Sequence, residues 1–205
     1  MKTTIACIIA ATSLLAGGAE EVAHRVKIAK IETQIQQTPR FEAAGVKDKQ
    51  FEPRYWLELE AELEVETTDP SGFIPELQTS WFAIIKDDRT GKPVQLTGKV
   101  AFRDVRTKDK KAYVIAYISP DTLEKITGKS RPGEGDVEAV ALVVSGSGIV
   151  SDGRHAAGLQ KATAEEDSKW WSSGRYQTME GLIVAKGKTP FAPLWSDRYP
   201  FEKPE

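Results

Sequence analysis

The sequence predicts an all-β protein, a two-sheet sandwich of about seven strands with one short helix near residues 120–127. Two observations carry this prediction. From residue 55 to residue 66, apolar and charged side chains alternate with a period of two, which indicates a strand with one buried face. Further runs rich in β-branched and aromatic residues follow, separated by turn signals and without an internal repeat, a pattern typical of immunoglobulin-like sandwiches.

Residues 1–19 have the composition of a secretion signal rather than of a folded segment. Lys2 precedes an apolar run over residues 5–15, and small residues end the segment at Ala19. The run is shorter than the roughly 20 residues of a membrane span, and no Cys follows it for lipid attachment. We therefore predict cleavage after Ala19 and export to the periplasm or to the outer membrane or cell surface. No stable membrane insertion is expected once the signal is removed.

Residues 20–205 are predicted to form a single domain without disulfide, metal or cofactor. The one Cys, Cys7, lies in the predicted signal, so the mature chain has no thiol. A chain with only 2 His would need carboxylates for most ligands of a transition-metal site. With 28 basic and 30 acidic residues, the chain also has no excess of positive charge to bind nucleic acid or an anionic membrane.

The strands are expected at successive positions along this domain. Residues 24–36 predict either a first strand with a bulge between Ile28 and Ile31 or two shorter strands, because the alternation changes phase there. The strand at 55–66 carries a row of glutamates, Glu58 to Glu66, which we expect to face solvent with Lys or Arg on a neighbouring strand. Later strands are expected at 77–86, at 94–105 with an interruption at Gly98, and at 112–118, 137–144 and 176–186.

One short helix is expected after the strand at 112–118. Ser119 is a suitable N-terminal cap, and Pro120 suits the first helical position. Gly128 suits the C-terminal exit, where the backbone often adopts a left-handed conformation. The helix is therefore predicted to occupy residues 120–127.

The sequence contains no recognisable catalytic constellation, and we predict that the protein is not an enzyme. Ser147 or Ser151, Asp152 and His155 supply the residue types of a hydrolytic triad, but neither serine lies in a strand-to-helix turn. An even row of glutamates on a flat strand face gives no pair with separate environments, which a glycosidase needs. A loop histidine is the preferred interpretation of His155.

The candidate binding residues are aromatic. Trp170 and Trp171 are adjacent, so on a strand only one of them could enter the core from a given face, and the other would be exposed or covered by a loop. The segment 189–205 interleaves prolines with large aromatic residues, and the prolines prevent it from pairing throughout as a central strand. We expect this segment to be ordered and either to pack along the domain, with Phe191 and Trp195 buried, or to dock to a partner.

The segment also carries a resemblance. Thr-Pro-Phe-Ala-Pro-Leu over residues 189–194, followed by Asp197-Arg198-Tyr199, resembles the C-terminal signature of a small family of exported, pilus-associated proteins from mucin-degrading verrucomicrobial bacteria. The resemblance implies an immunoglobulin-like sandwich, a link to type IV pilus systems and no catalytic residues. A prepilin keeps its apolar stretch after processing, whereas here that stretch would be lost. This difference favours an accessory part over the main fibre subunit.

The leading hypothesis is therefore an exported, non-enzymatic accessory or structural protein that binds envelope or pilus-apparatus proteins. The alternative is a carbohydrate-binding module that presents an exposed Trp to a glycan. Under either hypothesis, the predicted binding residues are Trp170, Trp171, Phe191, Trp195 and Tyr199.

Overall fold

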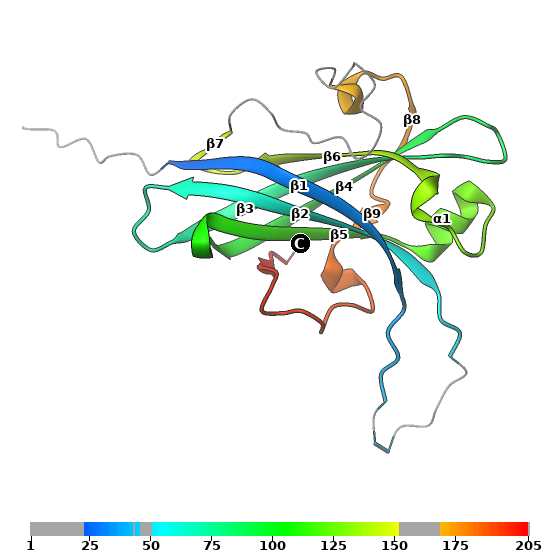
Figure 1. Ribbon diagram of the computed structural model, residues 1–205, viewed down its shortest axis with the longest axis horizontal. Helices are drawn as coiled ribbons and strands as arrows, with labels where there is room; N and C mark the ends of the chain where they lie inside the picture. The colour runs from blue at the N-terminus through cyan, green and yellow to red at the C-terminus, as the bar shows by residue number, and fades with distance from the viewer. Residues whose placement is uncertain (1–22, 43, 46–50, 152–168, 205) are drawn as a thin grey trace, which may run out of the picture.

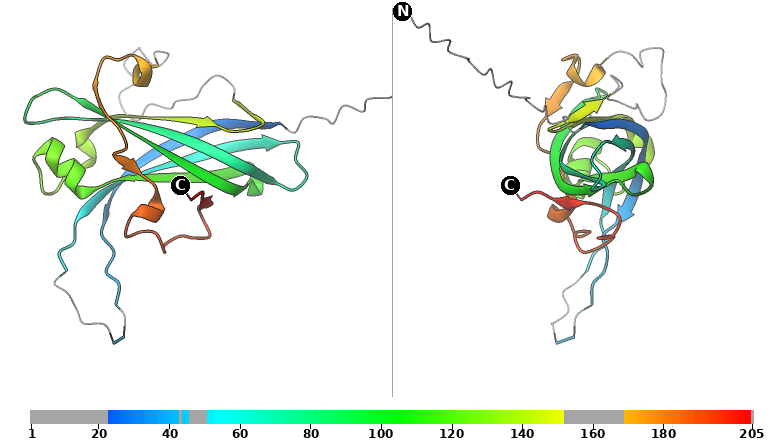
Figure 2. Two further views of the ribbon diagram at one scale, coloured as in Figure 1. Left: turned by 180° about the vertical axis from the view of Figure 1, so that it is seen from behind. Right: turned by 90° about the vertical axis from the view of Figure 1, so that its left-hand side faces the viewer.

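The computed structural model describes residues 23–42, 44–45, 51–151 and 169–204, which form ten strands in two sheets and one α-helix. The predicted signal peptide at 1–19 lies outside the described residues. Figures 1 and 2 show two twisted sheets stacked on each other around a common interior. The all-β sandwich predicted from the sequence is therefore confirmed.

The central strand pairings of both sheets are those of an immunoglobulin-like sandwich. The first sheet consists, in spatial order, of β7 (Ile149–Ser151), β1 (His24–Gln37), β2 (Tyr55–Thr67), β5 (Lys111–Ile118) and β9 (Ile183–Val184). The second consists of β10 (Phe201–Glu202), β4 (Val94–Arg106), β3 (Phe73–Ile85) and β6 (Val137–Ser145), and β8 (Gln177–Met179) pairs with β4. The second strand thus lies beside the fifth and the third beside the sixth, as in immunoglobulin domains.

The number of strands exceeds the seven or so expected, because four of the ten are very short. The strands β7, β8, β9 and β10 contain 3, 3, 2 and 2 residues. A run of two or three residues has no measurable alternation, so periodicity cannot reveal it. All the long strands, β1 to β6, lie where the sequence predicts a strand.

The predicted strand at 55–66 corresponds to β2, and its apolar face enters the core. Leu57, Leu59 and Leu63 are each 0% exposed. β2 pairs with β1 on one side and β5 on the other, so it lies inside the first sheet. The pairing of β1 with β2 shifts register between Ile28 and Lys30, which confirms the predicted bulge.

The interruption expected at Gly98 is wrong, because β4 runs through this residue without a break. Gly98 pairs with Trp81 of β3. A Cβ atom at Gly98 would lie 1.9 Å from the carbonyl oxygen of Ile183. The glycine is therefore required by the close approach of another backbone, and it does not mark a strand end.

The single strand expected at 176–186 is also wrong. This stretch contributes β8, which pairs in parallel with β4, and β9, which pairs with β5 of the other sheet. Gly181, with φ of +72°, lies between the two. The left-handed backbone at this glycine lets the chain turn from one sheet to the other.

The helix α1 (Pro120–Thr127) has the predicted ends. The side chain of Ser119 accepts the backbone N–H of Thr122 at 3.3 Å, and Gly128 has a φ of +71°. Both are standard capping arrangements for an α-helix. Among the described residues, no helix is long and apolar enough to cross a membrane.

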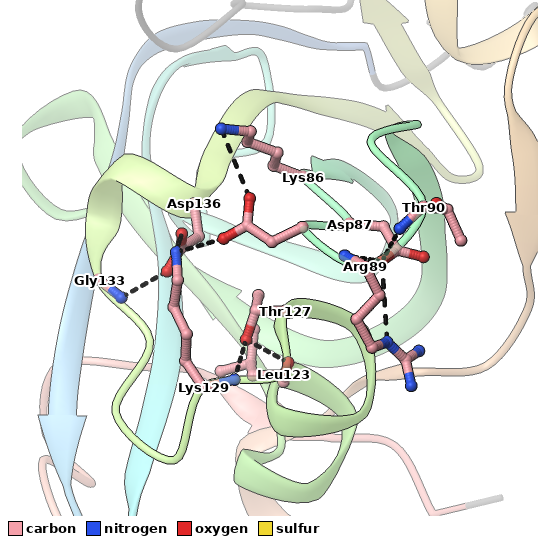
Figure 3. A network of polar contacts seen from close by, with 10 residues as sticks. Lys86, Asp87, Arg89, Thr90, Leu123, Thr127, Lys129, Gly133 and Asp136 are labelled. Atoms are coloured by element: carbon pink, nitrogen blue, oxygen red, sulfur yellow. Dashed lines mark hydrogen bonds and ion pairs between the residues drawn. The ribbon is translucent and has the colours of Figure 1, made fainter.

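A polar network fixes α1 against the hairpin between β3 and β4 (Figure 3). Lys129, just after the helix, forms ion pairs with Asp88 at 2.7 Å and with Asp136. Asp87 accepts the backbone N–H of Thr90 at 3.2 Å and so closes the hairpin loop. The aspartates of this loop therefore serve local structure.

Candidate functional site

The C-terminal tail, residues 189–204, lies against the outer face of β2 and β5 (Figures 1 and 2). It follows a short 3-10 turn at Lys186–Lys188 and ends in β10, where Phe201 and Glu202 pair with Arg103 and Phe102 of β4. The tail therefore runs from the edge of the first sheet at β9 to an edge of the second sheet. Of the two arrangements that its sequence allows, it adopts packing along the domain.

Phe191 anchors the tail to the sheet. Its side chain is 1% exposed, and its ring stacks on Tyr117 with the two centroids 4.9 Å apart. Trp56 meets the Phe191 ring edge-on at 6.1 Å. The buried Lys186 donates from Nζ to the carbonyl oxygen of Ala192 at 2.7 Å, and burial lowers the pKa of this lysine. Aromatic packing and hydrogen bonds together fix the first turn of the tail.

Glu58 lies beneath this aromatic cluster and is only 7% exposed. It accepts a hydrogen bond from the Tyr117 hydroxyl at 2.7 Å. Burial raises the pKa of Glu58. The pKa of Tyr117 is raised mainly by burial and also by its hydrogen bond to Glu58. The expectation that the whole glutamate row faces solvent is wrong at this position, because the aromatic residues of the tail and β5 cover it.

Glu60 connects the strand to the far part of the tail. Its carboxylate accepts two hydrogen bonds from Arg198, at 2.6 Å to Nη2 and 3.0 Å to Nε, and a third from the Tyr199 hydroxyl. Burial alone would raise the pKa of Glu60, but the bonds from Arg198 and Tyr199 outweigh it, so the pKa lies below its usual value. The Arg198 guanidinium also lies 4.0 Å from the ring centroid of Tyr113.

The remaining members of the glutamate row behave as expected from the sequence. Each pairs with a basic residue on a neighbouring strand: Glu62 with Lys111, Glu64 with Lys27, and Glu66 with Arg25. The Arg25–Glu66 pair has an N–O distance of 3.6 Å, and both side chains are more than two-thirds exposed, at 68% and 69%. Pairs of this kind contribute little to stability.

We expect Glu60→Gln to destabilise the domain by about 1–2 kcal/mol at neutral pH, because it removes the negative charge of a bidentate ion pair with Arg198. The loss is limited to this size because solvent partly screens Arg198. The lowered pKa of Glu60 means that its contribution is present above the ordinary glutamate pKa, near ~4.3, and is lost as pH falls through the folded-state value. Urea unfolding of both proteins from neutral to acid pH measures this. Glu66→Gln is the matched control, and an equal loss in both variants would contradict the special role of Glu60.

Trp195 is the exposed aromatic residue of the tail. Its ring lies nearly parallel to Phe191 at 6.1 Å, yet 43% of the residue is exposed, so the expectation that Trp195 is buried is wrong. Its φ of +54° is a left-handed value that non-glycine residues rarely adopt. A groove of about 460 Å³ lies beside it, lined by, among others, Glu32, Glu58, Glu60, Glu134 and Arg198.

The five predicted binding residues fall in two places. Phe191, Trp195 and Tyr199 come together on the outer face of the first sheet, with Phe191 buried, Tyr199 half-buried and Trp195 exposed. Trp170 and Trp171 lie in a 3-10 turn beside the second sheet. Both are half-buried, and Trp171 packs against Phe82 of β3.

Sequence reasoning missed Glu58, Glu60 and Arg198 as parts of this surface. Arg198 and Glu60 are separated by 138 positions, so no local pattern connects them. The one available signal is Arg198 itself, because an arginine among the aromatic residues of a tail needs a carboxylate partner when it is partly buried.

Among the described residues, no group of three or more His, Cys, Asp or Glu side chains could hold a metal ion. His24 is 2% exposed, and its Nδ1 lies 2.7 Å from the Thr67 hydroxyl, which is a structural contact. Asp152 and His155, which supply two residue types of a triad, lie outside the described residues.

Comparisons with known proteins find a family model and a solved structure that are similar to most of the chain. A protein-family model matches residues 17–205. A crystal structure of a protein from Akkermansia muciniphila is similar, with 24% sequence identity over 90% of this chain and 95% of that chain, and a TM-score of 0.75. None of the curated proteins matches the chain. That organism is a verrucomicrobial mucin degrader, the group indicated by the tail motif, and the structural likeness shows that the two proteins share a fold.

Proposed function

The chain belongs to the protein family whose model matches residues 17–205, and we propose that it is an exported, non-enzymatic accessory or structural component of a type IV pilus-like system. It acts by binding other proteins of the cell envelope, in the periplasm or at the cell surface. The composition of residues 1–19 supports export. The resemblance of the motif at 189–199 supports the pilus association.

The exposed ring of Trp195 is the observation that carries a binding role. A left-handed backbone costs a non-glycine residue roughly 1–2 kcal/mol, and such strain persists only where the surroundings enforce it. Phe191 on one side and Tyr199 on the other hold the turn in place. The fold therefore keeps a large aromatic side chain 43% exposed on a rigid support, which is the arrangement of an interface hot spot.

The groove beside Trp195 defines the chemistry of the partner. Among the described residues that line it, four are carboxylates, Glu32, Glu58, Glu60 and Glu134, and Arg198 is the one cation. Glu60 is already paired with Arg198 and Glu32 with Lys30, so Glu134 and Glu58, whose pKa burial raises, supply the negative charge that remains in the groove. A protein that binds here would place an apolar side chain on Trp195 and basic side chains at the rim, where charge complementarity sets specificity and association rate.

The test is a comparison of affinity captures from the native cell envelope. The tagged protein, expressed with its own residues 1–19, should recover envelope or pilus-apparatus proteins that mass spectrometry can identify. We expect Trp195→Ala to lower that recovery by about tenfold or more, since truncation of a central aromatic anchor commonly costs 2 kcal/mol or more. The melting temperature of the variant should stay close to that of the wild type because the ring is largely outside the core.

Phe41→Ala is the matched control, because Phe41 is also an exposed aromatic residue, at 57%, but lies in the connection between β1 and β2. It should leave the recovery unchanged. Capture that is insensitive to Trp195→Ala, or sensitive only to Phe41→Ala, would show that the tail surface is not the interface. Enrichment of no envelope protein by the wild type would contradict the proposed function itself.

A further inference from the structure

A second concave site lies on the opposite sheet, away from the tail surface. It is a cleft of about 780 Å³ between the outer face of β3 and β4 and the chain segment that leads from the Trp170–Ser172 turn through β9 to Lys188. Clefts of roughly 300–1,000 Å³ are typical of small-ligand sites. The proposed protein-binding role does not use this cleft, which we call the Trp171 cleft.

The aromatic wall of the Trp171 cleft is held from several directions. The Trp171 ring lies 6.4 Å from Phe82 of β3, and Trp170 meets it edge-on at 5.7 Å. The buried side-chain amide of Gln95 on β4 donates to the carbonyl oxygen of Trp171 at 3.0 Å. This part-buried hydrogen bond ties the turn to the sheet, so the wall is formed before any ligand arrives.

The other lining groups are mixed, because Ile183, Val184 and Ala185 add apolar surface beside a set of polar side chains. Hydroxyl groups come from Ser80, Thr97, Ser172 and Thr178, and charged groups include Lys99 and Glu180. A protein interface would need a larger apolar centre, and a nucleic acid would need a marked excess of positive charge. An aromatic wall beside many hydroxyl groups matches a sugar, whose C–H face packs on a ring while its hydroxyl groups exchange hydrogen bonds with the protein.

We propose that the Trp171 cleft binds a sugar unit of a glycan, with the sugar against the aromatic wall and its hydroxyl groups bonded to the polar side chains of β3, β4 and β8. Lys99 also lines the cleft and favours a sugar that carries a carboxylate or sulfate. The protein would then have two binding surfaces on opposite sheets, one for an envelope protein and one for a glycan.

The test uses a glycan array with neutral hexose, N-acetylhexosamine and acidic oligosaccharides, followed by calorimetric titration of the full-length mature protein with the strongest ligand. Trp171→Ala should weaken that binding by about tenfold or more, as expected for the loss of an aromatic anchor. Thr178→Arg should weaken it similarly, because a long side chain at this exposed cleft residue fills the site without removing the packing of Trp171. Melting curves show whether each variant is folded. If Trp171→Ala does not fold, the affinity of Thr178→Arg for the glycan tests the inference.

Trp195→Ala is the matched control and should bind the glycan as the wild type does, because Trp195 lies on the other sheet. A wild type that binds no oligosaccharide of the array at millimolar concentration would overturn the inference. So would glycan binding that survives both cleft variants or that is lost in Trp195→Ala. Recovery of the envelope partner should be unaffected by Thr178→Arg, so the two proposals can fail separately.

Discussion

The variant Phe191→Ala is expected to lower the free energy of unfolding by about 3–5 kcal/mol, the usual cost of removing a buried aromatic ring. Phe191 is 1% exposed and packs between Tyr117 and Trp56. Without the ring, a cavity opens at the tail anchor, and the buried Glu58 and its Tyr117 partner lose their cover. A loss of this size is a large part of the total stability of a typical domain. Urea unfolding monitored by circular dichroism measures it directly.

Trp195→Ala is the matched control in the same tail. Because 43% of Trp195 is exposed, its truncation should cost far less than that of Phe191, about 1 kcal/mol or below. If both variants lost the same amount, Trp195 would be a second anchor and not an exposed binding residue. A Phe191→Ala protein with the stability of the wild type would show that the tail does not pack on β2 and β5 in solution.

The core of the sandwich could be predicted from the sequence because it depends on local periodicity. The alternation in β2 predicts which residues are buried, since a strand that pairs on both sides must turn one face to the core. The helix α1 was equally predictable, because Ser119, Pro120 and Gly128 act within a few residues of the helix ends. Both predictions needed no knowledge of distant contacts.

The binding surfaces could not be predicted in the same way, because each depends on contacts between distant segments. The tail covers Glu58 and Glu60 but leaves Glu66 exposed, and the alternating pattern of β2 is the same at all three positions. The sequence predicts only that, if Trp170 and Trp171 were on a strand, their side chains would point to opposite faces. In the 3-10 turn, Trp171 packs against Phe82 of β3, and Trp170 meets the Trp171 ring edge-on.

Gly98 is a single position whose role also depends on a contact with a distant segment. Sequence alone suggests a strand end, since glycine weakens a strand interior. In the structure, Gly98 lies inside β4, where the strand passes directly beneath Ile183. The position of Ile183 is fixed by pairing with Ile118 of β5, and the neighbouring Leu182 donates its N–H to Thr97 at 3.0 Å. These contacts hold the backbone of β9 against that of β4, so the two strands cannot readily move apart.

Gly98→Ala is accordingly expected to destabilise the domain by about 3 kcal/mol, at the upper end of the range for overpacked positions. The added Cβ would lie 1.9 Å from the carbonyl oxygen of Ile183, so β9 must move and its pairing with β5 must weaken. Gly135→Ala is the matched control, since a Cβ there meets no atom within 4 Å among the described residues. Thermal and urea unfolding of both variants measure the difference in stability. Equal stabilities would mean that β9 does not cross β4 at this distance.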